Sequence, residues 1–173
     1  FYRHNKDIFE RLTAIPARLS EEFTPIKVDI DKRYLYTEMV ADLAKLAGAY
    51  PGLIQTEVIG QSEDGRDIHL IKLGKGEHKS LLLGGVHGCE IAATPLLIKM
   101  VNEYAGHYYG GEEFDGFNVK ELLDKVTLYI IPLVNPDGME IALKEGKTLH
   151  TQEVVEVFNQ IPGRPLTDWK ANA

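Results

Sequence analysis

The sequence predicts an α/β domain in which a mixed β-sheet is flanked by helices. Residues 80–86 and 126–134 are short apolar segments with the length of buried strands, and residues 37–50 and 91–104 carry apolar side chains at helical spacing. Strands that alternate with helices along a chain are typical of α/β domains. A polar turn between two further strand-like segments predicts an antiparallel pair, so we expect the sheet to be mixed.

Composition bounds the function classes. With 173 residues, of which 44% are hydrophobic, the chain can bury one sizeable core. The net charge of -7 and the dispersed 19 Lys and Arg residues argue against nucleic acid as a partner. No apolar run approaches the roughly 20 residues that cross a bilayer, so we expect no membrane span. The single cysteine, Cys89, permits no internal disulfide and leaves the redox compartment open.

The chain is expected to begin with an extension and a helix. Residues 1–33 show no sustained period, and we predict an N-terminal extension there, followed by the domain at 34–173. From Thr37, a residue type that favours helix starts, apolar side chains recur every three or four residues until Pro51-Gly52 ends the run. A helix over residues 37–50 is therefore expected.

Three strands and a helix are predicted next. Residues 53–60 and 67–73 read as strands of a hairpin, which would form an antiparallel edge. The segment 80–86 is apolar on both faces, as a central strand of an α/β sheet must be. The helix predicted over residues 91–104 can contain Pro95 only if this proline lies in the first turn.

The remaining pattern predicts a polar loop, a helix, a strand, a turn and a further helix. Residues 106–118 read as the loop, 119–124 as the helix and 126–134 as the second buried strand. The turn is expected at Asn135-Pro136-Asp137-Gly138, because proline fixes φ and glycine permits positive φ. A helix near residues 150–160 completes the prediction.

His87 and Glu90 are the candidate metal ligands. A catalytic zinc site needs nitrogen or oxygen ligands from three side chains and one open position. The spacing alone is weak evidence, because six His and sixteen Glu in this length give roughly half of one such pair by chance. A second pair, His150 and Glu153, lies in a polar segment and is interpreted as a solvated helix surface.

Position separates the first pair from the second. His87 and Glu90 fall where a buried strand ends and a helix begins, which is where open α/β sheets place their ligands. Gly84, Gly85 and Gly88 leave room for close backbone approach around them. The alternative is a structural histidine beside a glutamate that favours the helix dipole. His69, His78, His107 and His150 lie in a hairpin strand, a turn, a polar loop and a polar helix, so none is expected near His87.

Three ordered blocks, residues 59–66, 84–90 and 134–138, resemble the M14 family of zinc carboxypeptidases. The resemblance covers residues 34–173, which look like the N-terminal part of a zinc peptidase catalytic domain. The opening Tyr34-x-Tyr36-Thr37 and the end at residues 169–173 look more like the bacterial branch that contains γ-D-glutamyl-L-diamino acid endopeptidases. That branch cuts peptidoglycan stem peptides.

The resemblance implies that His87 and Glu90 bind one zinc ion. It also implies that the third ligand, the general base and the arginines that grip the substrate lie beyond Ala173, so no catalytic residue is assigned within this chain. Digestive members have Ser-Arg where this chain has Gly88-Cys89, which puts peptide contact there in doubt. We expect no chemical role for Cys89, a structural role for Asp137 and a surface or salt-bridging role for Arg66.

The full-length protein is accordingly expected to be a zinc-dependent metallopeptidase acting on peptidoglycan stem peptides, extracellular or at the cell wall of a bacterium, with a cytoplasmic location left open. The 173-residue chain alone is expected to be inactive, and its unpartnered sheet could self-associate. Two alternatives stay open: a carboxypeptidase of broad specificity, and a non-catalytic module that binds cell-wall peptides.

Overall fold

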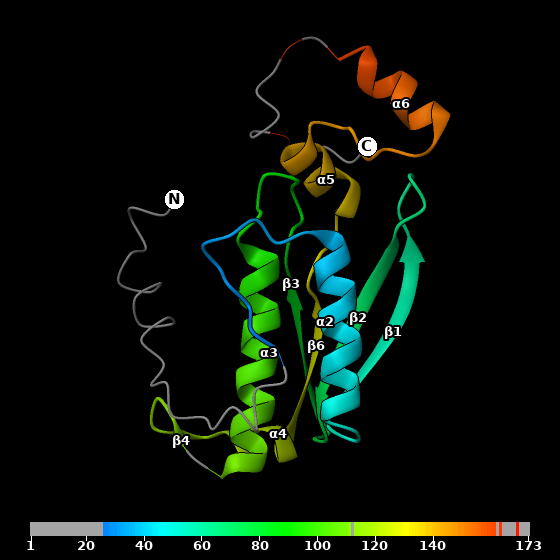
Figure 1. Ribbon diagram of the computed structural model, residues 1–173. Helices are drawn as coiled ribbons and strands as arrows, with labels where there is room; N and C mark the ends of the chain where they lie inside the picture. Colours follow the sequence, from blue (N-terminus) through cyan, green and yellow to red (C-terminus); the bar gives the residue numbers. More distant parts are fainter. Residues whose placement is uncertain (1–25, 112, 162, 164–168, 170–173) are drawn as a thin grey trace.

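The computed structural model describes residues 26–111, 113–161, 163 and 169. In these residues five helices and six strands follow one another along the chain (Figure 1). In chain order they are α2 (Tyr36–Ala49), β1 (Ile54–Gln61), β2 (Asp67–Gly74), β3 (His78–Leu83), α3 (Ala93–Gly110), β4 (Glu113–Phe114), β5 (Phe117–Asn118), α4 (Val119–Lys125), β6 (Val126–Ile131), α5 (Pro136–Lys144) and α6 (Gln152–Asn159). The predicted α/β class is confirmed.

The main sheet is mixed and has the strand order β1-β2-β6-β3. β1 pairs with β2 and β2 with β6 in antiparallel register, whereas β3 and β6 are parallel. The carboxyl ends of β3 and β6 and the β1–β2 turn therefore lie at the same end of the sheet, close to α5 (Figure 1). This end is the one that open α/β sheets use for ligands.

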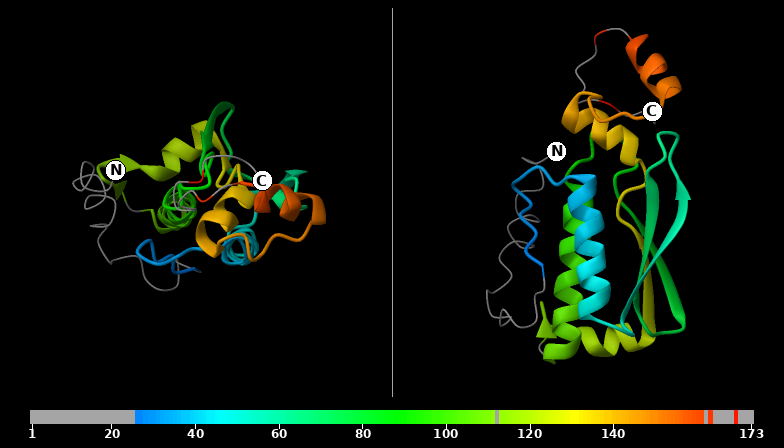
Figure 2. Two further views of the ribbon diagram at one scale, coloured as in Figure 1. Left: turned by 90° about the horizontal axis from the view of Figure 1, so that it is seen from above. Right: turned by 45° about the vertical axis from the view of Figure 1, so that its right-hand side comes forward.

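Helices α2 and α3 cover one face of the sheet (Figure 2). Met39 and Leu46 of α2 and Ile98 and Val101 of α3 are buried in one cluster with Ile71 of β2. The side chains on the other face include Leu81 and Leu83, which are 61% and 52% exposed. The described helices thus bury only one side of the sheet.

The sequence predicts β3 in the middle of the sheet, but this strand forms an edge of the described sheet, where it pairs only with β6. Its apolar composition on both faces does not reflect burial in these residues, since Leu81 and Leu83 are exposed while Leu82 packs against the core. An apolar run predicts a strand but does not give its neighbours.

Helix α3 extends further than predicted, from Ala93 to Gly110, and Pro95 lies in its first turn as expected. The helix continues past residue 104 because Ala105 and Tyr108 prolong the buried stripe, and it ends at Gly111, which adopts a φ of 71°. His107 is therefore a buried helical residue, not part of a polar loop. His78, expected in a turn, is the first residue of β3.

The predicted turn at residues 135–138 begins helix α5. Asn135 is the N-cap, and its side-chain oxygen accepts a hydrogen bond of 2.8 Å from the backbone N–H of Gly138. Pro136 occupies the first turn, where its missing N–H costs nothing, and Asp137 favours the positive end of the helix dipole. The residue types that make turns also start helices, which explains why the sequence pattern does not predict this helix.

Candidate functional site

The loop that follows β3 brings the two predicted ligands together. His87 Nδ1 lies 2.8 Å from Glu90 Oε1, and the backbone N–H of His87 donates to Glu90 Oε2 at 3.1 Å. The backbone N–H of Glu90 donates in turn to the carbonyl oxygen of His87 at 3.0 Å, which closes a tight turn between them. The hydrogen bond from the His87 side chain holds the pKa of Glu90 below its usual value.

Three glycines set the course of this loop. The backbone N–H of Val134 donates to the carbonyl oxygen of Gly84, and that of Asn135 donates to Gly85, both at 2.9 Å. Gly85 has a φ of 56°, which favours glycine. A Cβ atom on Gly88 would collide with the backbone of Gly138 in α5. The loop after β3 therefore rests directly on the start of α5.

The donor set fits zinc in part. One imidazole nitrogen and one carboxylate face each other on side chains that are 48% and 42% exposed, and both are ordinary zinc ligands. No group of three or more His, Cys, Asp or Glu side chains that could hold a metal ion occurs within the described part of the chain. The pair could thus provide two of the three protein ligands that a catalytic zinc site needs.

Cys89 lies between the two ligands and is half-buried. Its backbone N–H donates to the carbonyl oxygen of Trp169 at 2.8 Å, and the Trp169 ring packs against Phe158 of α6 with ring centroids 5.7 Å apart. We call residues 84–90 the ligand loop. This loop is therefore held by Trp169, which follows Cys89 by 80 residues, a contact that the sequence pattern does not indicate.

The second His-x-x-Glu match has a different environment. His150 precedes α6, its side chain is 71% exposed, and its backbone N–H donates to Asp64. Glu153 lies in the first turn of α6 and is exposed. The interpretation of this match as a solvated surface agrees with these positions.

Arg66, which the sequence predicts at the surface or in a salt bridge, is buried between two carboxylates. Arg66 Nη1 lies 2.5 Å from Asp64 Oδ2 and 2.7 Å from Asp137 Oδ1, and Nη2 donates to the carbonyl oxygen of Thr148. All three charged side chains are at most 6% exposed. Asp137, for which a structural role is expected, is one of the two carboxylates, and we call Asp64, Arg66 and Asp137 the turn cluster.

Hydrogen bonds keep two members of the turn cluster, Asp64 and Arg66, charged. Burial alone would lower the pKa of Arg66, but the bonds to Asp137 and Asp64 raise it above its ordinary value. Burial would raise the pKa of Asp64, yet backbone N–H groups of Thr151 and His150, together with Arg66, hold it below its usual value. The co-occurrence of residues 59–66 and 134–138 as motif blocks was the available signal for this contact.

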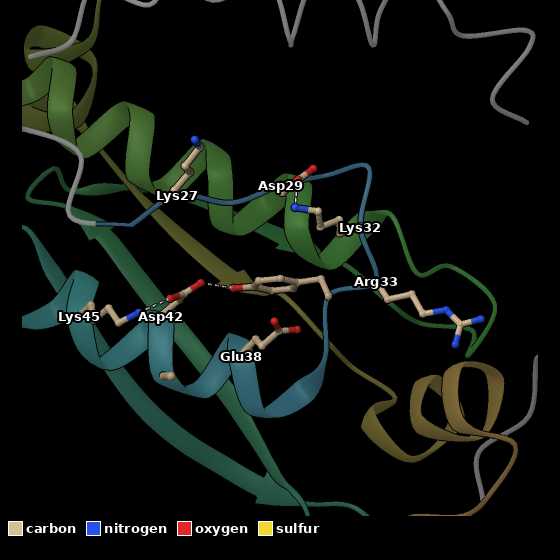
Figure 3. A pocket seen from close by; sticks show the side chains of 9 residues that line it. Lys27, Asp29, Lys32, Arg33, Glu38, Asp42 and Lys45 are labelled. Carbon is tan, nitrogen blue, oxygen red and sulfur yellow. Dashed lines mark hydrogen bonds and ion pairs between the residues drawn. The ribbon is translucent and has the colours of Figure 1, made fainter. Parts of the chain in front are cut away.

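A separate hollow of about 400 Å³ lies between α2 and the segment that precedes it (Figure 3). Lys32 pairs with Asp29 at 2.9 Å, and Lys45 pairs with Asp42 at 3.0 Å. The buried hydroxyl of Tyr34 donates to the same Asp42. These contacts engage four of the charged side chains that line the hollow. The loop after β3 is the better candidate site, because two side chains of metal-binding type face each other there.

One family model and several individual protein sequences match this chain. A family model described as zinc carboxypeptidase, Peptidase_M14, matches residues 39–158. Gamma-D-glutamyl-L-diamino acid endopeptidase 1 of Lysinibacillus sphaericus is 29% identical over 148 residues, covering 84% of this chain and 36% of that protein. Human carboxypeptidase Z is 30% identical over 118 residues, and this match covers 64% of the present chain and 18% of carboxypeptidase Z. The chain spans less than two fifths of these relatives.

Solved structures share the fold. Thrombin-activatable fibrinolysis inhibitor matches with a TM-score of 0.64 at 17% identity, over 95% of this chain and 36% of that one. Carboxypeptidase A of Helicoverpa armigera matches with a TM-score of 0.57 at 18% identity, over 99% of this chain and 36% of that one.

The family model covers more than half of the chain and includes both His87 and Glu90. The chain therefore belongs to the M14 family of zinc carboxypeptidases.

Proposed function

We propose that the protein to which this chain belongs is a zinc-dependent peptidase that hydrolyses peptidoglycan stem peptides. The observation that carries the proposal is the facing pair His87 and Glu90, 2.8 Å apart at the carboxyl end of β3, in a chain that belongs to a family of zinc peptidases. The cell-wall substrate is supported by the bacterial endopeptidase, whose match covers 84% of this chain.

In this proposal His87 and Glu90 bind the zinc ion, and the ion activates the substrate. A zinc ion held by His87 and Glu90 would supply a Lewis acid that polarises the peptide carbonyl. The backbone N–H of His87 holds the Glu90 carboxylate through Oε2, and the His87 ring contacts Oε1 of the same carboxylate, so the two side chains already face each other before a metal binds. The third protein ligand and the general base are proposed to lie beyond Ala173.

The site is expected to work outside the cytoplasm, at the cell wall where stem peptides occur. No helix among the described residues is long and apolar enough to cross a membrane.

A carboxypeptidase acting on ordinary peptides is the second candidate, because human carboxypeptidase Z is 30% identical over 118 residues.

The test uses the full-length protein with two substrates, γ-D-Glu-diaminopimelate peptides and ordinary peptides with a free carboxyl end. We expect zinc-dependent cleavage of the first, with the activity lost in His87→Ala and Glu90→Ala. His150→Ala is the matched control, since it removes the histidine of the other His-x-x-Glu pair, and it should keep the wild-type rate.

Each other outcome has a meaning. Cleavage of ordinary peptides alone would reject the cell-wall substrate in favour of the carboxypeptidase. Binding of stem peptides without cleavage of either substrate would support a non-catalytic module. Full activity in both ligand variants would overturn the metal site itself.

A further inference from the structure

The turn cluster joins the β1–β2 turn to helix α5. Asp137, in the first turn of α5, accepts three hydrogen bonds from the hairpin turn: from Ser62 Oγ at 2.8 Å, from the backbone N–H of Asp64 at 3.0 Å and from Arg66 Nη1 at 2.7 Å. Its side chain is 3% exposed. The start of α5 is therefore fixed by a part of the chain about 70 residues earlier.

The same turn of α5 contacts the metal-ligand loop. The backbone of Gly138, the residue after Asp137, lies so close to Gly88 that no side chain fits between them. The backbone N–H of Asn135, the N-cap of α5, donates to Gly85 at 2.9 Å. One helix start thus meets the turn cluster through Asp137 and the ligand loop through Asn135 and Gly138.

Stability alone does not account for the turn cluster. A buried arginine between two carboxylates loses much hydration, and replacing such ion groups with apolar side chains is often neutral or stabilising. The geometry that the planar guanidinium provides is different: it holds Asp64 and Asp137 with one nitrogen and Thr148 with the other. Hydrogen bonds from a guanidinium fix the orientation of the groups that accept them, which an apolar side chain cannot do. The ligand loop needs such fixed neighbours if its two side chains are to keep the geometry of a metal site.

We infer that Arg66 is a positioning residue for the His87–Glu90 metal loop, acting through Asp137 and the first turn of α5. Arg66 contacts neither ligand, so it is not a catalytic residue. The inference rests on the proposed function for its zinc measurement, but the contact between α5 and the loop can be tested without metal.

The first experiment measures amide hydrogen exchange in the metal-free 173-residue chain. Arg66→Lys keeps the charge and removes the fork. We expect about tenfold faster exchange at the amides of Val134 and Asn135, which bond Gly84 and Gly85, a size typical of coupling through packed elements. The amide of Gly74, which bonds Leu53 at the far end of the hairpin, should keep its rate.

The matched control is Lys72→Ala, which removes a half-exposed ion pair with Glu57 from the same hairpin. It should leave the amides of Val134 and Asn135 unchanged. Equal exchange in Arg66→Lys and wild type, or faster exchange that includes Gly74, would overturn the inference, because the second result describes general loss of stability.

The second experiment measures the zinc dissociation constant of the full-length protein by competition with a chelator. Arg66→Lys should bind zinc about tenfold more weakly, whereas Lys72→Ala should match wild type. A wild-type zinc affinity in Arg66→Lys would reject the positioning role. If the wild-type protein itself binds no zinc, the proposed function fails, and the exchange result still decides whether Arg66 controls the loop.

Discussion

Gly88 is the point where the ligand loop and α5 lie closest. A Cβ atom there would meet the carbonyl oxygen, carbonyl carbon and Cα of Gly138, all of them backbone atoms that cannot rotate away. We expect Gly88→Ala to lower the free energy of unfolding by about 1–3 kcal/mol, as overpacking does, and to weaken zinc binding.

The control for this change is Gly60→Ala. A methyl group on Gly60 would meet no atom within 4 Å, and this glycine has no positive φ, so the free energy of unfolding of the variant should stay near that of wild type. Urea unfolding followed by circular dichroism measures both variants. Equal stability of the two would show that the loop and α5 separate easily.

Asp64 predicts a dependence of stability on pH. Its pKa in the folded chain lies below the ordinary value of 3.8, so the ionised carboxylate stabilises the fold above about pH 4, and this stabilisation is lost as the pH falls through the folded pKa. Asp64→Asn should therefore lower the free energy of unfolding by about 2 kcal/mol at pH 7, and the difference from wild type should shrink below pH 4.

Urea titrations from pH 7 down to the lowest pH at which both chains fold would test this. Asp29→Asn, which removes an exposed ion pair with Lys32, should have almost no effect at any pH. A difference between Asp64→Asn and wild type that stays constant with pH would contradict the assigned role of the carboxylate.

At the scale of the elements, helix α5 connects the ligand loop with the β1–β2 turn. Its N-cap, Asn135, is 3% exposed, whereas Asn118, the N-cap of α4, is exposed; both accept a backbone N–H three residues ahead. Asn135→Ala should cost about 1–2 kcal/mol of unfolding free energy, and Asn118→Ala about 0.5–1 kcal/mol. Thermal unfolding compares them, and the reverse order would show that the α5 cap is dispensable.

The elements were predictable where periodicity is long. Met39, Leu43 and Leu46 repeat at helical spacing and gave α2 within one residue at each end. Helix α5 escaped prediction because Asn135, Pro136 and Gly138 are equally typical of a turn. Residue types report local backbone preference, while the following helix depends on the burial of Met139 and Ile141, which only the tertiary packing provides.

At the scale of the whole molecule, one sheet face carries apolar side chains that no described element covers. Leu81 and Leu83 project from edge strand β3. We expect the isolated chain to self-associate through this face, and Leu81→Lys to shift it toward the monomer, because a buried lysine would lose its hydration. Sedimentation velocity measures the change.

The matched control is Val157→Lys on α6, where Val157 is 52% exposed. This substitution should leave the distribution of species unchanged. A monomeric wild-type chain would refute the expectation.

The candidate site was half predictable from the sequence for a geometric reason. His87 and Glu90 are three residues apart and follow an apolar strand, so their proximity is a local property of the chain. Arg66 and Asp137 are 71 residues apart, and their ion pair depends on the hairpin turn and the start of α5 lying at one end of the sheet. Pairwise contacts over that distance leave no period in a single sequence.

Trp169 gives the ligand loop an optical label of its own. It is the only tryptophan in the chain, its side chain is 8% exposed and packs against Phe158, and its carbonyl oxygen holds the N–H of Cys89 between the two ligands. Its fluorescence can be excited selectively, so the emission of the unmodified 173-residue chain would follow the loop directly as a metal enters or leaves.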